Sequence, residues 1–426
     1  MAFRDLQKPR GRPINILVLN AGSSSYKSCL YRLPKGGVLP TDAPRPQWER
    51  QSSADADGTT RAESLRALIG SLWSGPGAVI GGPGEIDAVG HRVVHGGADF
   101  RDTVRITPEV KAAIRDLCDL APAHNPAALD GIDAAQALLG ETVPQFAVFD
   151  TAFHRDIPNA AAVYPGPYDW VEQGIRRYGF HGINHQYVAD RAARLLGRPL
   201  ANLRMVSCHL GNGCSLAAIR NGKSVDTTMG FTPMEGLMMG SRSGSVDPGI
   251  PLYLMRRHGY DAEKLDRMLN RESGLKGISG ISEDMREIAA ARVRGDARAQ
   301  LAFDIYVHRL SAGIAAMVPS LGGVDALIFT GGVGEHDAEL RNVVCERLSF
   351  LGIQLSAEQN EAAPAGDRNI AATGSAVGVW VIRAEEDWAI AGECTAFFLA
   401  PPSPVRKVAD DFPTLVPRSQ GKGTRG

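Results

Sequence analysis

One segment of the 426-residue chain, Met205–Ile250, holds two features that could bind and transfer a phosphoryl group. The turn Gly211–Gly213 separates two short apolar runs, so the pattern predicts two antiparallel strands joined by a tight turn. Backbone N–H groups in such a turn can cradle an anion. Arg242 follows within Gly-Ser-Arg-Ser-Gly, and an arginine can hold a phosphate with two parallel hydrogen bonds. These are two parts that phosphoryl transfer requires.

Polar residues also lie at the ends of three other strand-like apolar runs, namely Asn20, Arg92 and Asp150. A carboxylate just past a parallel strand points into the crevice where α/β proteins bind ligands. The residues alone leave alternatives open. The turn after Asn20 could be a plain hairpin, Arg92 could pair with an internal aspartate, and Asp150 could cap a helix.

Two histidines raise a similar choice. His181 lies between glycines in Tyr-Gly-Phe-His-Gly, where its ring could approach a ligand, although a lone histidine is more often structural. His209 lies near Cys208 and Cys214, which suggests zinc, but the fourth ligand and the usual spacing are absent. We therefore predict no zinc site.

Composition excludes several classes of partner. The formal net charge is −1, and charged residues make up 22% of the chain, so neither nucleic acid nor a membrane surface is an expected partner. No apolar run predicts a membrane span, and the N-terminus lacks an apolar signal core. The six cysteines are scattered and form no C-x-x-C pair, which favours free thiols and a cytoplasmic location.

The elements that must position these residues form an α/β pattern. Ile16–Leu30 and Met205–Ile219 both have the pattern strand, turn, strand, which predicts two related domains whose turns face a shared cleft. Gly274–Gly280 should be a loop, Ser282 should cap a helix, and Gly331–Glu335 should be a glycine-rich turn after a strand. Further helices are expected over Arg61–Leu72, Pro108–Leu120, Ala127–Leu139, His185–Leu196, Pro251–Arg257, Asp261–Leu269, Ala297–Val318 and Leu340–Leu348.

Eight motifs in this order strongly resemble the acetokinase family, which includes acetate, propionate and butyrate kinases: NAGSSSYK, GHRVVHGG, APAHNP, FDTAFH, YGFHG, HLGNGCS, MGFTPMEGLMMGSRSGSVDPG and FTGGVGE. The match runs from about Ile14 to about Ala391. The resemblance implies two related domains of the actin-like ATPase (ribonuclease H-like) superfold with a nucleotide cleft between them. It places residues 1–150, completed by about 387–426, in the first domain and residues 151–386 in the second.

The resemblance also implies an activity and roles for individual residues. The family transfers a phosphoryl group reversibly between ATP and a short-chain carboxylate such as acetate, uses Mg²⁺ (with Mn²⁺ as an alternative), and forms homodimers. Asp150, His181 and Arg242 are similar to its catalytic residues, and Asn20 and Glu386 to its metal ligands, with Glu385 as the fallback. The residues similar to its carboxylate-binding set are Arg92, Val94, Ala123, Phe180 and Pro233. Those similar to its nucleotide-binding set are Lys27, His209, Leu210, Gly211, Asn212, Gly213, Asp284, Met285, Arg286, Gly331, Gly332, Val333, Gly334 and Glu335.

Departures from the family pattern affect detail more than reaction class. Ala123 replaces a common leucine, which leaves space in the acyl pocket and favours propionate more than usual. His336 replaces a common asparagine, and Ser245 and Val246 replace a common acidic-aliphatic pair. The rival functions are a propionate or butyrate kinase, a non-catalytic nucleotide-binding relative, and a sugar kinase. The last would have no reason to carry Arg92.

Overall fold

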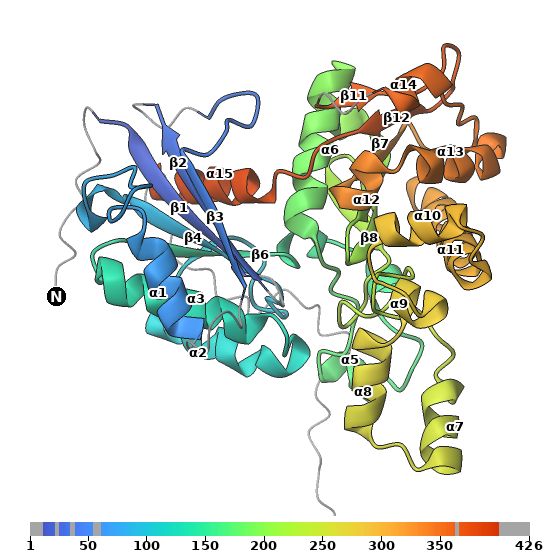
Figure 1. The fold of residues 1–426 in the computed structure, drawn as a ribbon, viewed down its shortest axis with the longest axis horizontal. Coiled ribbons are helices and arrows are strands. Elements are labelled where there is room, and N and C mark those ends of the chain that lie inside the picture. The colour runs from blue at the N-terminus through green and yellow to red at the C-terminus, as the bar shows by residue number, and fades with distance from the viewer. Residues whose placement is uncertain (1–11, 22–24, 35–38, 54–60, 363–365, 400–426) are drawn as a thin grey trace, which may run out of the picture.

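The computed structural model describes residues 12–21, 25–34, 39–53, 61–362 and 366–399. Two six-stranded sheets lie side by side (Figure 1), with strand orders β3-β2-β1-β4-β6-β5 and β11-β12-β10-β7-β8-β9. The Gly-Ser turn after Asn20, most of the N-terminal leader and the C-terminal tail fall outside the described residues.

The first sheet is enclosed by helices on both faces. Its strands are β1 (Ile14–Ala21), β2 (Ser25–Leu33), β3 (Trp48–Ser53), β4 (Ala88–Val93), β5 (Val104–Arg105) and β6 (Gln145–Phe149), and its helices are α1 (Arg61–Gly70), α2 (Pro108–Asp116), α3 (Asn125–Leu139) and α15 (Glu386–Leu399). Alternate side chains of β1 point to opposite faces. Leu17 and Leu19 pack with α1 and α3, whereas Ile16 and Val18 pack with α15. The last helix of the chain therefore completes the first sheet, as its red ribbon among blue strands shows in Figure 1.

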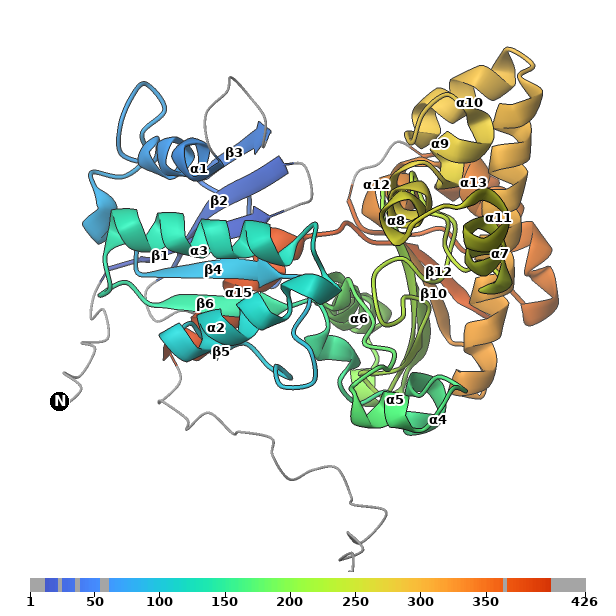
Figure 2. The same ribbon diagram turned by 90° about the horizontal axis from the view of Figure 1, so that it is seen from below.

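The second sheet has the same layers. Its strands are β7 (Arg204–Leu210), β8 (Cys214–Arg220), β9 (Lys223–Thr227), β10 (Ala326–Thr330), β11 (Arg368–Asn369) and β12 (Gly378–Val381). Val206 and Cys208 of β7 pack with α11 (Ala297–Leu321), and Met205 packs with α6 (Gly182–Leu196). Figure 2 shows α6 between the two sheets. In each half an antiparallel hairpin begins the sheet and a parallel strand follows, which matches the similarity predicted from Ile16–Leu30 and Met205–Ile219.

The predicted elements differ from the observed ones where glycine-rich segments become helical. Gly274–Gly280 is not a loop but forms α9 (Gly274–Ser279), and its residue Leu275 is buried in the core. Gly331–Glu335 forms a short helix, α12 (Gly331–His336), and the next helix is α13 (Ala338–Arg347). The helix predicted to begin at Ser282 is α10 (Met285–Val293), and Asp284 caps it by accepting from the Arg286 N–H. The predicted Thr107 cap of α2 is confirmed.

Helix α11 is the one described helix that is long and apolar enough to cross a membrane, by length and composition alone, contrary to the expectation that no run reaches that length. Its inner face is buried in the core of the second half, where Phe303, Val307 and Leu310 pack beneath the sheet. Asp304, His308 and Arg309 are exposed on its outer face. Core helices of globular proteins have this division between faces. The predicted domain boundaries near residues 150 and 386 stay a prediction.

Candidate active site

Arg92 lies at the centre of the site, near the end of β4, and is mostly buried. Its Nη2 donates to Asp150 Oδ2 at 2.7 Å and its Nε to Asp150 Oδ1 at 3.1 Å, so the two side chains form a fork across 58 residues of sequence. Its Nη1 faces Asn20 Oδ1 at 3.3 Å and Glu386 Oε2 at 3.5 Å. Burial alone would lower the pKa of Arg92, but the carboxylates of Asp150 and Glu386 raise it above its usual value. The guanidinium therefore links the side chains of Asn20, Asp150 and Glu386.

His181 enters the site from the start of α6 in a strained backbone conformation, with φ of 56°. The glycine that follows explains the position, because a Cβ on Gly182 would overlap the Asp150 carbonyl. The Gly182 N–H donates to that carbonyl at 2.9 Å. This contact places the His181 ring 3.5 Å from Arg92 Nη2 and 3.8 Å from Glu386 Oε1. Asp150 thus positions both the arginine and the histidine.

His181, His209 and Glu386 bring their ligand atoms within 4.8 Å of one another. The two rings stack with centroids 4.1 Å apart. Burial lowers the pKa of His209 to about 3, so this imidazole is neutral, and its Nδ1 faces the Asn184 amide at 2.8 Å. Burial would raise the pKa of Glu386, but the Arg92 guanidinium and a hydrogen bond from His181 lower it well below its usual value. The carboxylate is therefore ionised and available to a cation.

Asp387 is a functional candidate that the sequence did not reveal. This buried carboxylate accepts from Asn20 Nδ2 at 2.9 Å and pairs with Lys27 Nζ at 2.8 Å. Burial would lower the pKa of Lys27, but Asp387 outweighs burial and raises it. With its amide nitrogen bonded to Asp387, Asn20 turns its carbonyl oxygen toward Arg92 Nη1, the nitrogen that also faces Glu386. Lys27 reaches the site through this carboxylate.

The turn Gly211–Gly213 and the arginine loop pack directly against each other. The Gly240 N–H donates to the Asn212 carbonyl at 3.1 Å. Arg242 is held by a bond from its Nη1 to the Pro233 carbonyl at 3.1 Å. A Cβ on Gly213 would lie 3.1 Å from His181 Nε2, closer than usual, and 3.6 Å from Arg242 Nη1, an ordinary contact, so both side chains lie against the turn. His124, which sequence reasoning passed over, borders the same charges, and burial with Arg242, Arg92 and His181 lowers its pKa to about 3.

A model of the acetokinase family matches residues 15–392. The chain belongs to the acetokinase family. An acetate kinase from Gloeobacter violaceus is 58% identical over 401 residues, covering 89% of this chain and 98% of that protein. The crystal structure of acetate kinase from Porphyromonas gingivalis matches with a TM-score of 0.80 at 40% identity, covering 90% of this chain and 99% of that one. A propionate kinase from Francisella tularensis matches with a TM-score of 0.80 at 36% identity and the same coverage. The expected two-domain actin-like fold is confirmed.

Two groups of the residues expected to bind the nucleotide lie at the starts of helices. Asp284, Met285 and Arg286 begin α10, and Asp284 accepts from Arg286 Nε at 3.0 Å while the arginine side chain stays largely exposed. Gly331, Gly332, Val333, Gly334 and Glu335 form α12. Glu335 does not project freely, because its Oε1 accepts from the N–H groups of Gly331 at 3.0 Å and Ala384 at 2.9 Å. It therefore fixes the backbone of this helix.

A buried arginine supports the same helix. Arg341 is 1% exposed and donates from Nη1 to the Gly334 carbonyl at 2.9 Å. Its other nitrogens donate to Asn360 Oδ1 at 2.8 Å and to the Asn360 carbonyl at 3.0 Å. Burial lowers the pKa of Arg341 to about 10, which leaves it charged at neutral pH. The end of α12 is thus attached to α14 (Ala357–Glu361) through one side chain.

The expected acyl-pocket residues are placed unevenly. Val94 and Phe180 are buried in the core of the second half, and Pro233 is partly buried beside Arg242. Ala123 is exposed, in the turn that leads into α3. The structure therefore joins Pro233 to Arg242, while Ala123 lies at the surface of the first half.

Proposed function

We propose that this chain is an acetate kinase, which transfers the terminal phosphoryl group of ATP to acetate and gives acetyl phosphate and ADP, reversibly. The convergence of Arg92, His181 and Glu386 at one point carries the proposal, because it joins an anion-binding cation, a phosphoryl-facing imidazole and a cation-binding carboxylate. The acetate kinase relative at 58% identity supports the same reaction.

The proposed mechanism needs no general base, because acetate is already ionised and attacks through its own carboxylate oxygen. Catalysis then depends on in-line positioning and on neutralisation of charge. Arg92 would orient the carboxylate of acetate. His181 and Arg242 would donate to the oxygens of the phosphoryl group as it moves, and the Gly211–Gly213 turn would hold the phosphates of ADP.

We propose Asn20 and Glu386 as the protein ligands of Mg²⁺, with Mn²⁺ as an alternative ion. The residues fit this ion, since both present oxygen atoms to the same Arg92 nitrogen, and Mg²⁺ is commonly bound by one or two protein oxygens with phosphates and water. The ion would neutralise charge on the phosphates of ATP. Glu385 lies 3.4 Å from Arg383 instead, so Glu386 is the better placed of the two acids.

Asp150 should act by positioning and not as a base. Asp150→Asn removes the charge that holds Arg92, so we expect turnover to fall about tenfold to a hundredfold, as for other residues that orient ligands of a site. The Mg²⁺ concentration needed for half-maximal rate should rise with it. Steady-state kinetics over a Mg²⁺ series would measure both. Near-normal turnover with unchanged Mg²⁺ dependence would rule out this role.

Propionate kinase activity is the alternative, favoured by Ala123 in place of a bulkier residue. Ala123→Leu should raise the acetate-over-propionate ratio of kcat/KM by about tenfold or more, because one methylene contributes roughly 1–3 kcal/mol in a pocket. Parallel kinetics on the two acids would give the ratio, and an unchanged ratio would remove Ala123 from the acyl pocket. Its exposed position makes this a direct test of whether the cleft closes over it.

The decisive experiment for the function is a coupled assay of ADP formation from ATP and Mg²⁺, with acetate, propionate and butyrate in parallel. The highest kcat/KM is expected with acetate. A higher value with propionate would select the alternative, and no turnover with any of the three acids would reject both.

We also propose a cytoplasmic location, supported by six free cysteines, and cell fractionation would test it.

We further propose a homodimer formed through α7 (Gly249–His258). None of the ten residues of this helix is buried, and Ile250, Leu252, Tyr253 and Met255 are each at least 44% exposed. Such contiguous apolar surface usually marks an interface. Replacing Ile250 and Tyr253 by glutamate should yield a monomer in sedimentation equilibrium. Phe350→Glu, at an exposed position on another segment, is the matched control and should leave the dimer intact. A wild-type monomer at micromolar concentration would contradict the proposal.

A further inference from the structure

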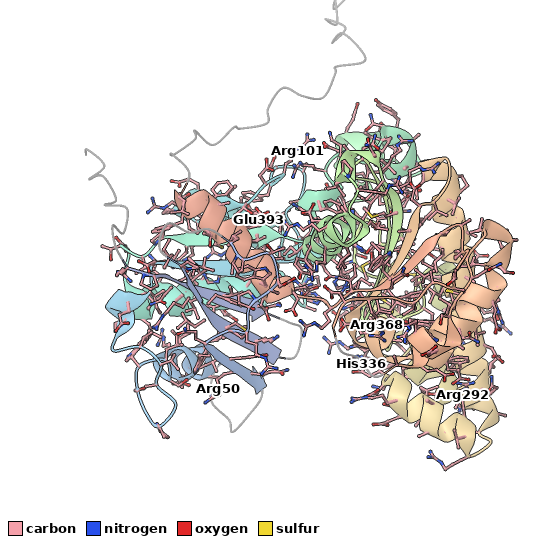
Figure 3. The ribbon with its side chains drawn as sticks, turned by 90° about the horizontal axis from the view of Figure 1, so that it is seen from above. Arg50, Arg101, Arg292, His336, Arg368 and Glu393 are labelled. Atoms are coloured by element: carbon pink, nitrogen blue, oxygen red, sulfur yellow. The ribbon has the colours of Figure 1, made fainter. Side chains whose placement is uncertain are left out.

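A charged cavity, which we call the basic cavity, lies beside α12. Its volume is about 450 Å³, and it is lined by Arg45, Glu335, His336, Gly366, Arg368, Val381 and Arg383. Arg45 belongs to the segment before β3 of the first sheet, and the other residues belong to the second half. Figure 3 shows Arg368 and His336 close together on the side of the second half that faces the first. The cavity therefore draws cationic side chains from both halves.

Positive charge in the basic cavity exceeds the negative charge of its lining, which holds three arginines and one carboxylate, that of Glu335. Among the described residues, neither Arg45 nor Arg368 forms an ion pair, and the Nε of Arg368 is buried without a hydrogen-bond partner. Arg383 has one carboxylate at 3.4 Å, in Glu385. The carboxylate of Glu335 already accepts from two backbone N–H groups. A buried donor without an acceptor is costly, so an anion that enters the cavity would relieve an existing penalty.

The segments that line the cavity are fixed to one another. Arg191 of α6 bridges Asp42 and Asp367, with both ion pairs at 2.6 Å. Arg191 and Arg194 also point toward the Thr41 carbonyl, at 3.5 and 3.4 Å. The Arg383 N–H donates to Asp367 at 3.1 Å. These contacts hold the segments of Arg45, Arg368 and Arg383 in place, so the cationic groups are held near one another before any ligand binds.

The basic cavity is separate from the phosphate-binding turn. It lies over β11 and β12, at one side of the second sheet, whereas the Gly211–Gly213 turn joins β7 and β8 beyond β10. Helix α12 lies between the two places, since it follows β10 directly. His336 at the end of α12 has its Nδ1 2.9 Å from the Gly332 carbonyl, which fixes the ring.

We propose that the basic cavity is a second anion site, which binds a small phosphate-bearing anion in addition to the nucleotide. Three guanidinium groups match the bidentate geometry that phosphate oxygens favour. A bound anion would connect Arg45 of the first half to Arg368 of the second. The anion would also lie against Glu335, which holds the N–H groups of Gly331 and Ala384, and so would contact the helix that bears the nucleotide residues. This anion site is independent of the proposed reaction, because its test measures binding of an anion and not catalysis.

Calorimetric titration of the full-length protein with pyrophosphate would test the site, with and without a saturating non-hydrolysable ATP analogue. We expect one binding event that persists with the analogue present. Arg368→Gln and Arg45→Gln should each weaken it by about tenfold, the loss expected for one charge-assisted contact. Arg50→Gln is the matched control, because Arg50 is exposed in the same half and does not line the cavity (Figure 3). Inorganic phosphate and a hexose phosphate in parallel would distinguish a free phosphate ion from a phosphorylated metabolite.

Three outcomes would overturn the proposal. They are absence of binding to the wild-type protein, equal binding by wild type and the Arg45 and Arg368 variants, and loss of binding when the nucleotide analogue is present. Circular dichroism and thermal melting of each variant would establish that it is folded before titration. Weaker binding by both cavity variants, with unchanged binding by Arg50→Gln, would support the site whatever the substrate of the enzyme.

Discussion

Replacing Arg242 by glutamine should lower kcat by about a thousandfold and leave KM for ATP nearly unchanged. Within the described residues the Arg242 side chain forms no ion pair and one hydrogen bond, to the Pro233 carbonyl, so its charge is available to an incoming anion. The side chains of Arg242 and His181 both lie next to Gly213 of the phosphate-binding turn. A preorganised donor aimed at charge that develops in the transition state typically contributes about 3–4 kcal/mol, which corresponds to this loss. Rates from stopped-flow and steady-state assays would measure it.

Two controls separate this role from a structural one. Arg242→Lys retains the charge without the planar fork, so it should recover part of the lost rate. Arg101→Gln removes an exposed arginine, labelled in Figure 3, which pairs with Asp156 on the surface and should leave kcat unchanged. A kcat for Arg242→Gln within about tenfold of wild type would reject the transition-state role, since the loss would be no larger than that of an ordinary hydrogen bond.

Replacing Glu386 by glutamine should raise the Mg²⁺ concentration required for half-maximal rate by about a hundredfold. The carboxylate is ionised in the structure, since Arg92 and a hydrogen bond from His181 lower its pKa in spite of burial. Glutamine keeps the size of the side chain but removes the charge that binds the ion, and losing one ionic contact typically costs roughly 1.5–3 kcal/mol. Kinetics over a Mg²⁺ series would measure the shift, and the maximal rate at high Mg²⁺ should partly recover.

The neighbouring acid supplies a matched control. Glu385→Gln changes the same residue type one position earlier, where the carboxylate lies near Arg383 and away from Arg92. Its Mg²⁺ dependence should equal that of the wild type. If Glu385→Gln showed the larger shift, the assignment of the metal ligand to Glu386 would be reversed.

Local sequence was sufficient to predict the strands and hairpins, because alternating burial and glycine turns depend on neighbours along the chain. It could not decide the role of Arg92, which the residues left open between binding a ligand and pairing with an aspartate. The structure shows the pair with Asp150, and the same geometry leaves the arginine beside Glu386 and His181. Sequence distance hid Asp387 entirely, since its contact with Asn20 spans 367 residues. Long-range contacts of this kind carry no local signature.

Glycine-rich segments were the other source of error. Gly331–Glu335 has the composition of a turn, yet it is helical because Glu335, Arg341 and Asn360 supply hydrogen bonds that glycine cannot. Helix propensity is a weak prior when buried polar side chains hold the backbone. The same reasoning applies to α9, where burial of Leu275 outweighs the cost of two glycines.

Helix α15 determines when during its own synthesis this protein becomes an enzyme. One face of the first sheet is covered by Trp388, Ile390, Ala391 and Cys394, which are among the last described residues to leave the ribosome. Until they emerge, Ile16 and Val18 have no partner on that face, and the segment that carries Glu386 is missing as well. Nascent chains usually fold domain by domain from the N-terminus. Here the first half waits until residues 386–399 have been made, so a chain that stops before them has neither a finished core nor Glu386, the proposed metal ligand.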